Sequence, residues 1–170
     1  MNNETDFDIH FLPVIHSYVK SYQEVKEPFL KKKLKEGLKD TLKKWTDQPV
    51  KMVSQSVLEK ASQMSPPINP YDLMYTDRKK LGMVESGDKL PKSWLVWEHS
   101  TPLNELYQNL VECRSLEEIK DVLSNYSGVC WISRDEDNQL NKNGFRSTRP
   151  GGWKECYKQC GINFIYKESL

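Results

Sequence analysis

The sequence has little net charge, no long apolar runs and few histidines. Its 170 residues carry a formal net charge of +1, so no overall field would draw the protein onto nucleic acid or an anionic membrane. No stretch approaches the roughly 20 apolar residues that a membrane-spanning helix needs, and no glycine-rich phosphate loop or dinucleotide fingerprint is present. No secretory signal pattern opens the chain, so we expect a cytoplasmic protein with no membrane partner.

Cysteine is also scarce, and a cytoplasmic protein should keep its four cysteines as reduced thiols. Cys156 and Cys160 are four residues apart on a predicted helix, so their side chains share one face. Structural zinc usually takes four ligands, and no second matching pair accompanies these two. We therefore expect both thiols to pack on the core rather than hold zinc. Cys130 lies inside an apolar run and should be a core residue as well.

The composition predicts one compact α+β domain overall. Apolar residues make up 37% of the chain and charged residues 29%, which allows both a core and a well-solvated surface. We expect a predominantly helical N-terminal half, and a small sheet with helices in the C-terminal half. The predicted division is a helical region at 1–65, a connecting segment at 66–92 and a mixed α/β region at 93–170.

Apolar spacing predicts the helices of the first half. Pro13 interrupts an early apolar cluster, and helical spacing then runs from Val14 to about Val25. Pro28 is well placed to open the next helix, and a shorter helix is expected from Gln55 to Met64. The strongest periodic signal belongs to the helix after Pro28, whose apolar positions are Leu30, Leu34, Leu38, Leu42 and Trp45.

Turn and capping signals divide the second half more clearly. We expect strands at 93–97, 129–132 and 162–166. Helices are expected from Thr101-Pro102 onward, after the capping box of Ser115 and Glu118, and after that of Ser133 and Glu136. A last helix is predicted from Trp153 to Cys160.

The segment from Leu95 to Pro102 is the most informative for function. An apolar strand ends in Glu98 and His99, and a proline follows three residues later. This pattern resembles the first strand of HNH, or ββα-metal, nucleases, which carry an acid–histidine or a histidine pair at a strand end. A carboxylate can ligate a hard cation such as Mg²⁺. A neighbouring imidazole can deprotonate the attacking water.

The resemblance covers at most residues 93–143 and implies a small metal-dependent nuclease of a bacterial defence or mobile-element system. It implies Mg²⁺ or another divalent cation as cofactor, with Glu98, Asp137 and Asn141 as metal ligands. It assigns catalysis to His99 and Asn125. An alternative stays open, in which Glu98 and His99 merely end a strand and His99 makes a structural hydrogen bond.

Basic residues indicate a second hypothesis, a nucleic-acid-binding module that does not cut. Positions 31 to 44 contain seven lysines but only two acidic residues. Among these lysines, Lys32, Lys35 and Lys39 are the candidates for contact with DNA or RNA phosphates. Arg146 and Arg149 belong to a segment that we expect to be an exposed, phosphate-binding loop. Lysines on an amphipathic helix are also common as a merely solvated face.

A third hypothesis is a binding protein without catalysis, such as an inhibitor or adaptor of phage or mobile-element type. It would need no cofactor and would dock on a protein partner. Its determinants would be exposed aromatic side chains, for which Trp94, Tyr107 and Trp153 are the candidates.

Overall fold

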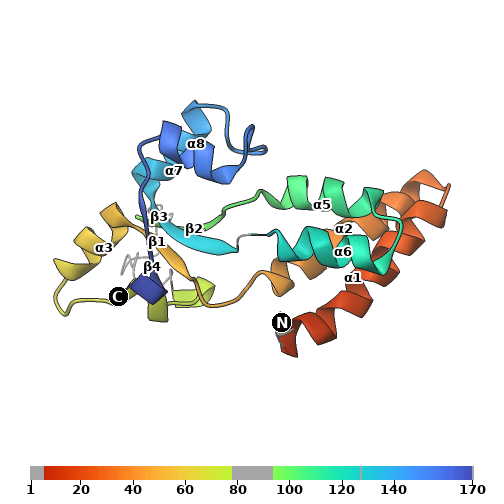
Figure 1. The fold of residues 1–170 in the computed structure, drawn as a ribbon, viewed down its shortest axis with the longest axis horizontal. Coiled ribbons are helices and arrows are strands. Elements are labelled where there is room, and N and C mark those ends of the chain that lie inside the picture. The colour runs from red at the N-terminus through yellow and green to blue at the C-terminus, as the bar shows by residue number, and fades with distance from the viewer. Residues whose placement is uncertain (1–5, 78–93, 127, 170) are drawn as a thin grey trace, which may run out of the picture. The chain divides into compact units, whose positions relative to one another are not determined.

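A computed structural model describes residues 6–77, 94–126 and 128–169 of the chain. These residues form two compact units, each assembled from two separate stretches of sequence. The helical unit comprises Met1–Thr46 and Pro102–Ser127, and the sheet unit comprises Asp47–Thr101 and Gly128–Leu170. The predicted α+β class is confirmed, with helices predominating in the N-terminal half and one small sheet (Figure 1).

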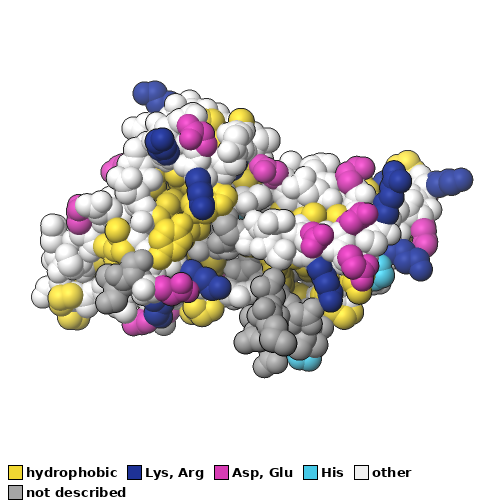
Figure 2. Space-filling model, in the orientation of Figure 1, with side chains coloured by type: hydrophobic (Ala, Val, Ile, Leu, Met, Phe, Trp, Pro, Cys, Tyr) yellow, Lys and Arg dark blue, Asp and Glu magenta, His cyan; other side chains and the backbone are white. Residues whose placement is uncertain are grey.

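The helical unit consists of α1 (Asp6–Glu24), α2 (Pro28–Trp45), α5 (Leu103–Glu112) and α6 (Leu116–Ser124). Each helix contributes one apolar stripe to a shared core. Its most deeply buried members are Ile15, Val19, Leu38, Leu42, Leu106, Tyr107, Leu110 and Ile119. Side chains of both charges are scattered over the face of this unit that Figure 2 displays.

Two features of α1 and α2 refine the sequence predictions. Pro13 does not interrupt α1, which continues through it although proline forfeits one helical hydrogen bond. Phe11, before the proline, still packs against the core. Pro28 opens α2 as predicted, and Leu38, Leu42 and Trp45 are buried. Leu30, at the start of the same stripe, is 50% exposed because the stripe extends beyond the core.

The sheet unit contains four strands in the order β2-β3-β1-β4. They are β1 (Met52–Ser54), β2 (Leu95–His99), β3 (Val129–Ser133) and β4 (Phe164–Tyr166). β1 and β3 are parallel, and the other neighbouring pairs are antiparallel. β1 lies in the region predicted to be helical, because three residues are too few for alternation to be recognised.

Helices of the sheet unit are α3 (Gln55–Ser62), α7 (Arg134–Lys142) and α8 (Trp153–Gln159), with 3₁₀ turns at Pro70–Asp72, Tyr75–Asp77 and Lys167–Ser169. The two turns before residue 78 lie in the predicted connecting segment, of which residues 78–92 are outside the described part. No helix within the described residues combines the length and the apolar character needed to cross a membrane.

Side chains of β3 alternate between two apolar clusters, one on each face of the sheet. Val129 and Trp131 pack with residues of α3 and of the turn at Pro70–Asp72. Cys130 and Ile132 pack with Leu140 of α7 and Tyr157 of α8. The alternation follows from the two-residue repeat of a strand. Cys130 is fully buried, as predicted.

Candidate functional site

Glu98 lies on the α7–α8 face of the sheet. Its register partner is Cys130, whose side chain belongs to that face. Nη2 of Arg149 donates to Oε1 of Glu98 over 2.5 Å. The Arg149 side chain is only 1% exposed, and that of Glu98 is 20% exposed. The pair therefore joins the end of β2 to the loop between α7 and α8 in a largely water-free setting.

The position of Arg149 corrects the expectation of an exposed loop that binds phosphate. The backbone turns back there, with the amide of Gly152 donating to the Arg149 carbonyl and positive φ angles at Gly151 and Gly152. The guanidinium lies 5.5 Å from the ring centroid of Tyr157. A buried cation needs a counter-charge, and Glu98 supplies it. Arg146, in the same loop, is exposed as predicted.

Burial controls the protonation of this cluster. It raises the pKa of Glu98 to about 7, although the Arg149 charge opposes the rise; the Asp137 charge adds to it. Burial also raises the pKa values of the Cys130 thiol and the Tyr157 hydroxyl. Both groups are consequently neutral at physiological pH, and neither is an activated nucleophile.

Asp137 approaches Glu98 closely enough to influence its charge, and it has partners of its own. Nη1 of Arg134 donates to its Oδ2 over 2.8 Å. The Asn141 amide, one turn along α7, donates to its Oδ1 over 3.3 Å. Within the sheet unit, α7 directly follows β3, which pairs antiparallel with β2. In the sequence, α5 and α6 of the helical unit separate β2 from β3.

His99 is separated from Glu98 by the geometry of the strand. Its register partner is Val129, which packs on the opposite face from Cys130. Because pairing is regular through the end of β2, the imidazole lies on the α3 side and the carboxylate on the α7–α8 side. The structure therefore places Glu98 within the electrostatic influence of Asp137 but puts His99 on the opposite face of the sheet from Glu98.

The residues present do not fit a divalent-cation site. Each of the two carboxyl groups is already paired with an arginine, so the cluster lacks the negative excess that a cation site needs. Within the described residues, no three acidic, histidine or cysteine side chains assemble into a ligand group. Asn125 belongs to the other unit, where its amide donates to the Asp121 carbonyl at the end of α6.

A second candidate site is a row of lysines on α2, here called the lysine stripe. It consists of Lys31, Lys32, Lys35 and Lys39, which lie within about 100° of one another around a helix with about 3.6 residues per turn. None of the four forms an ion pair with another described residue. The acidic residues of α2 instead pair with Lys33 and Lys43.

Aromatic rings of the helical unit hold the stripe in place. The Lys35 and Lys39 ammonium groups lie 5.1 and 5.2 Å from the ring centroid of Tyr107, and that of Lys31 lies 4.7 Å from the ring of Tyr22. Burial lowers the pKa of Lys39, and the charges of Lys35 and Lys43 lower it further. Positive potential therefore accumulates along this face, which an anion would relieve.

The aromatic residues proposed for protein docking differ in exposure. Tyr107 is 1% exposed, so the expectation that it lies on the surface is wrong: its ring fills the core of the helical unit. Trp94 and Trp153 are half-buried, with the ammonium groups of Lys60 and Lys154 about 5 Å from their rings.

The two helix-face cysteines are packed as predicted. Cys156 is fully buried, and its thiol donates to the Pro150 carbonyl over 3.3 Å. Cys160 is partly buried against the α7–α8 cluster. Both are free thiols.

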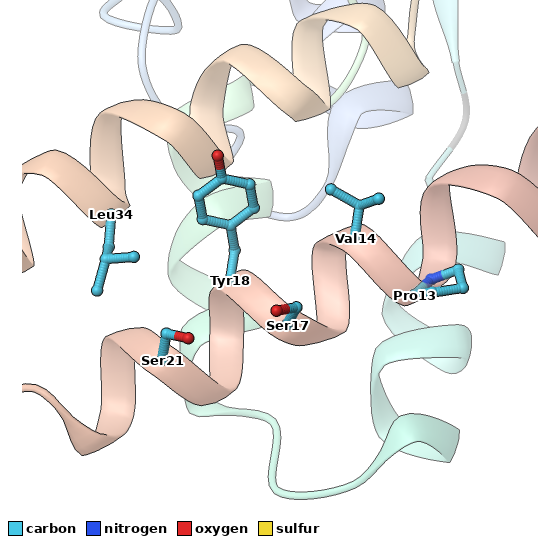
Figure 3. A pocket seen from close by; sticks show the side chains of 6 residues that line it. All are labelled: Pro13, Val14, Ser17, Tyr18, Ser21 and Leu34. Atoms are coloured by element: carbon cyan, nitrogen blue, oxygen red, sulfur yellow. The ribbon is translucent and has the colours of Figure 1, made fainter.

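A pocket of about 380 Å³ lies between α1 and α2 (Figure 3). Its lining offers hydroxyl and apolar groups but no carboxylate, imidazole, thiol or amine, so it lacks the groups that acid–base catalysis needs. The lining residues are Pro13, Val14, Ser17, Tyr18, Ser21 and Leu34. Tyr18 points from α1 toward α2. Gly37 permits this approach, since a Cβ at that position would lie 2.6 Å from Cε1 of Tyr18.

Sequence reasoning did not find the partnership of Glu98 with Arg149, because the two are 51 residues apart. The only available signal was a lone buried-strand acid, which must find a cation somewhere in the chain. Comparison with protein-family models, with curated proteins and with solved structures finds no match for this chain.

Proposed function

We propose that this protein binds nucleic acid through the lysine stripe of α2, without cutting it. One observation carries the proposal: four lysines that form no ion pair with another described residue line one face of a helix. A phosphate backbone is the polyanion that such a row fits, because binding releases its condensed counterions. Because the net charge of the chain is near zero, such an attraction must come from a local group of basic residues, which the stripe provides.

The dimensions of the stripe suit a short stretch of backbone. Lys31 and Lys39 are eight residues apart, which corresponds to about 12 Å along a helix. The ammonium groups of Lys35 and Lys39 are already held against one ring, so less side-chain entropy is lost when they meet phosphate. The core covers the apolar face of α2 at Leu38, Leu42 and Trp45, so the lysines lie on the outward side of this part of the helix.

The test is fluorescence anisotropy with labelled DNA and RNA oligonucleotides of about 30 nucleotides, in EDTA and over a range of salt concentrations. The variant Lys32→Gln/Lys35→Gln/Lys39→Gln should bind at least tenfold more weakly at low salt. Its logarithmic salt dependence should be shallower by about 2, at about 0.7 per lysine for single strands.

A matched control has the same loss of charge in the same unit. The variant Lys20→Gln/Lys26→Gln/Lys44→Gln removes three exposed lysines that lie outside the stripe. Its affinity should remain within about twofold of the parent, and circular dichroism should give the same helix content for all three proteins. Equal losses in both triple variants, or a parent that binds no oligonucleotide, would overturn the proposal.

The nuclease hypothesis stays a prediction: the charge of Asp137 acts on Glu98, but both carboxyl groups are paired with arginines and His99 lies on the other face of the sheet. Its test is incubation of the protein with plasmid DNA and Mg²⁺ or Mn²⁺. Cleavage that His99→Ala abolishes would support it. Cleavage that proceeds equally in His99→Ala, or none in the parent, would remove it.

A further inference from the structure

The first turn of α2 exposes an aromatic ring beside the lysine stripe. Phe29 is 62% exposed, the largest value among the exposed large apolar residues described. An isolated apolar side chain on a surface needs no explanation. Here, however, Lys32 and Lys33 follow at three and four residues along the same helix, where side chains are neighbours. The Lys33 ammonium lies 5.8 Å from the ring centroid.

From this juxtaposition we infer that the protein prefers single-stranded nucleic acid, with Phe29 stacking on an unpaired base while the lysine stripe holds the adjoining phosphates. This inference rests on the proposed function and specifies its ligand. An aromatic ring can stack only on a base that is not already stacked within a duplex. Proteins that bind single strands commonly combine basic residues, which contact the phosphates, with exposed aromatic rings, which stack on the bases.

The local structure fixes the backbone that carries the ring. Glu27 caps α2, with its carboxylate accepting from the backbone amides of Phe29 and Leu30. The cap fixes the backbone from which Phe29 projects. Its negative charge lies at the positive end of the helix dipole, which offsets the repulsion that a nearby phosphate would feel. Tyr22 is less suited to this role, because it packs edge-on against Tyr107 at 5.9 Å.

An anionic membrane is the rival ligand for an exposed ring among lysines. Insertion into a membrane surface requires a continuous apolar helix face. In α2 that face is largely buried in the helical unit, through Leu38, Leu42 and Trp45. A single ring and a single leucine remain exposed at one end of the helix. The single-strand assignment therefore agrees better with the way α2 packs.

The experiment compares labelled oligo-dT and oligo-U with a duplex of equal length, using the full chain in EDTA. Phe29→Ala should weaken binding to both single strands by fivefold or more, leave duplex affinity within twofold, and leave the salt dependence unchanged. Phe29→Tyr should restore single-strand binding because it keeps the ring. Leu30→Ala is the matched control, since Leu30 is the adjacent exposed apolar residue at 50% exposure, and it should bind like the parent.

Any of the following results would reject the preference for single strands. If Phe29→Ala binds single strands like the parent while the stripe variant does not, nucleic-acid binding stands and the single-strand assignment falls. Equal losses in Phe29→Ala and Leu30→Ala, or equal losses for single strands and duplex, also overturn it. Vesicles of phosphatidylcholine and phosphatidylserine form a further arm; loss of vesicle binding alone in Phe29→Ala would assign the ring to a membrane. A parent that binds no nucleic acid removes both proposals.

Discussion

The buried pair of Glu98 and Arg149 allows a pH-dependent stability to be worked out from the structure. Glu98→Gln replaces the carboxyl by a neutral group of similar shape at every pH. Burial raises the folded-state pKa of Glu98 from 4.5 to about 7, so the folded protein holds this proton more tightly than the unfolded chain. The contribution of Glu98 to stability is then complete below about pH 4.5, falls as the pH rises toward 7, and is lost above it.

The size of the effect follows from the change in pKa. At about 1.4 kcal/mol per pH unit, a rise from 4.5 to about 7 amounts to roughly 3 kcal/mol in the free energy of unfolding. Relative to the parent, Glu98→Gln should therefore gain about 2–3 kcal/mol of stability between about pH 5 and pH 8. Pairwise comparison at each pH cancels the titration of the other groups.

Urea unfolding followed by tryptophan fluorescence is the suitable assay. Four of the five tryptophans belong to the sheet unit, so the signal reports mainly on the unit that contains the pair. If the stability of Glu98→Gln relative to the parent is the same at about pH 5 and about pH 8, or falls between them, the reasoning is refuted. Attraction to Arg149 would then outweigh the cost of burying the carboxylate.

Three further predictions concern packing and capping, each measured by urea unfolding followed at 222 nm. Gly37→Ala should lower the stability of the parent, because its Cβ would lie 2.6 Å from Cε1 of Tyr18. In a Tyr18→Ala background the same change should raise the free energy of unfolding by about 1 kcal/mol, because alanine is a better helix former than glycine. Stabilisation in both backgrounds would contradict the contact. Glu136→Ala should lower the free energy of unfolding by about 1–3 kcal/mol, because Glu136 Oε2 accepts from the buried Ser54 hydroxyl over 2.7 Å. A double-mutant cycle with Ser54→Ala should give a coupling energy of at least about 0.5 kcal/mol. Additive effects of the two substitutions would argue against the hydrogen bond. Leu110→Ala should cost about 2–5 kcal/mol, because this fully buried side chain leaves a cavity in the helical core; a cost below about 1 kcal/mol would contradict its burial.

Local signals in the sequence located most elements. The spacing of Leu38, Leu42 and Trp45 predicted the buried face of α2, and the capping box of Ser133 and Glu136 is present at the start of α7. Glu136 also accepts from Ser54, which caps α3. This second bond joins residues 82 apart, and no local pattern could have indicated it. Capping chemistry is local, whereas the pairing of one cap with another depends on the tertiary fold.

The division into units was also beyond local patterns. The sequence predicted one compact domain with a helical first part, but α5 and α6 return to the helices of the N-terminus, and β1 joins the sheet of the later residues. The packing of α5 and α6 on the N-terminal helices and the pairing of β1 with later strands are both contacts between segments that are distant in the sequence. Amphipathic helices of similar apolar content present stripes that do not specify which partner will cover them.

The pair of Glu98 and His99 illustrates that adjacency in a sequence does not fix where two side chains point in the fold. Two adjacent residues can act on one substrate atom only if the chain leaves regular strand geometry between them, since successive side chains in a strand point to opposite faces. Pairing of His99 with Val129 continues the β2–β3 ladder through the last residue of the strand. The carboxylate therefore faces Arg149 and the imidazole faces away from it. The nucleic-acid binding proposed for α2 does not depend on this pair, because the four lysines lie on one face of a single helix, where spacing in the sequence does fix which side chains are neighbours.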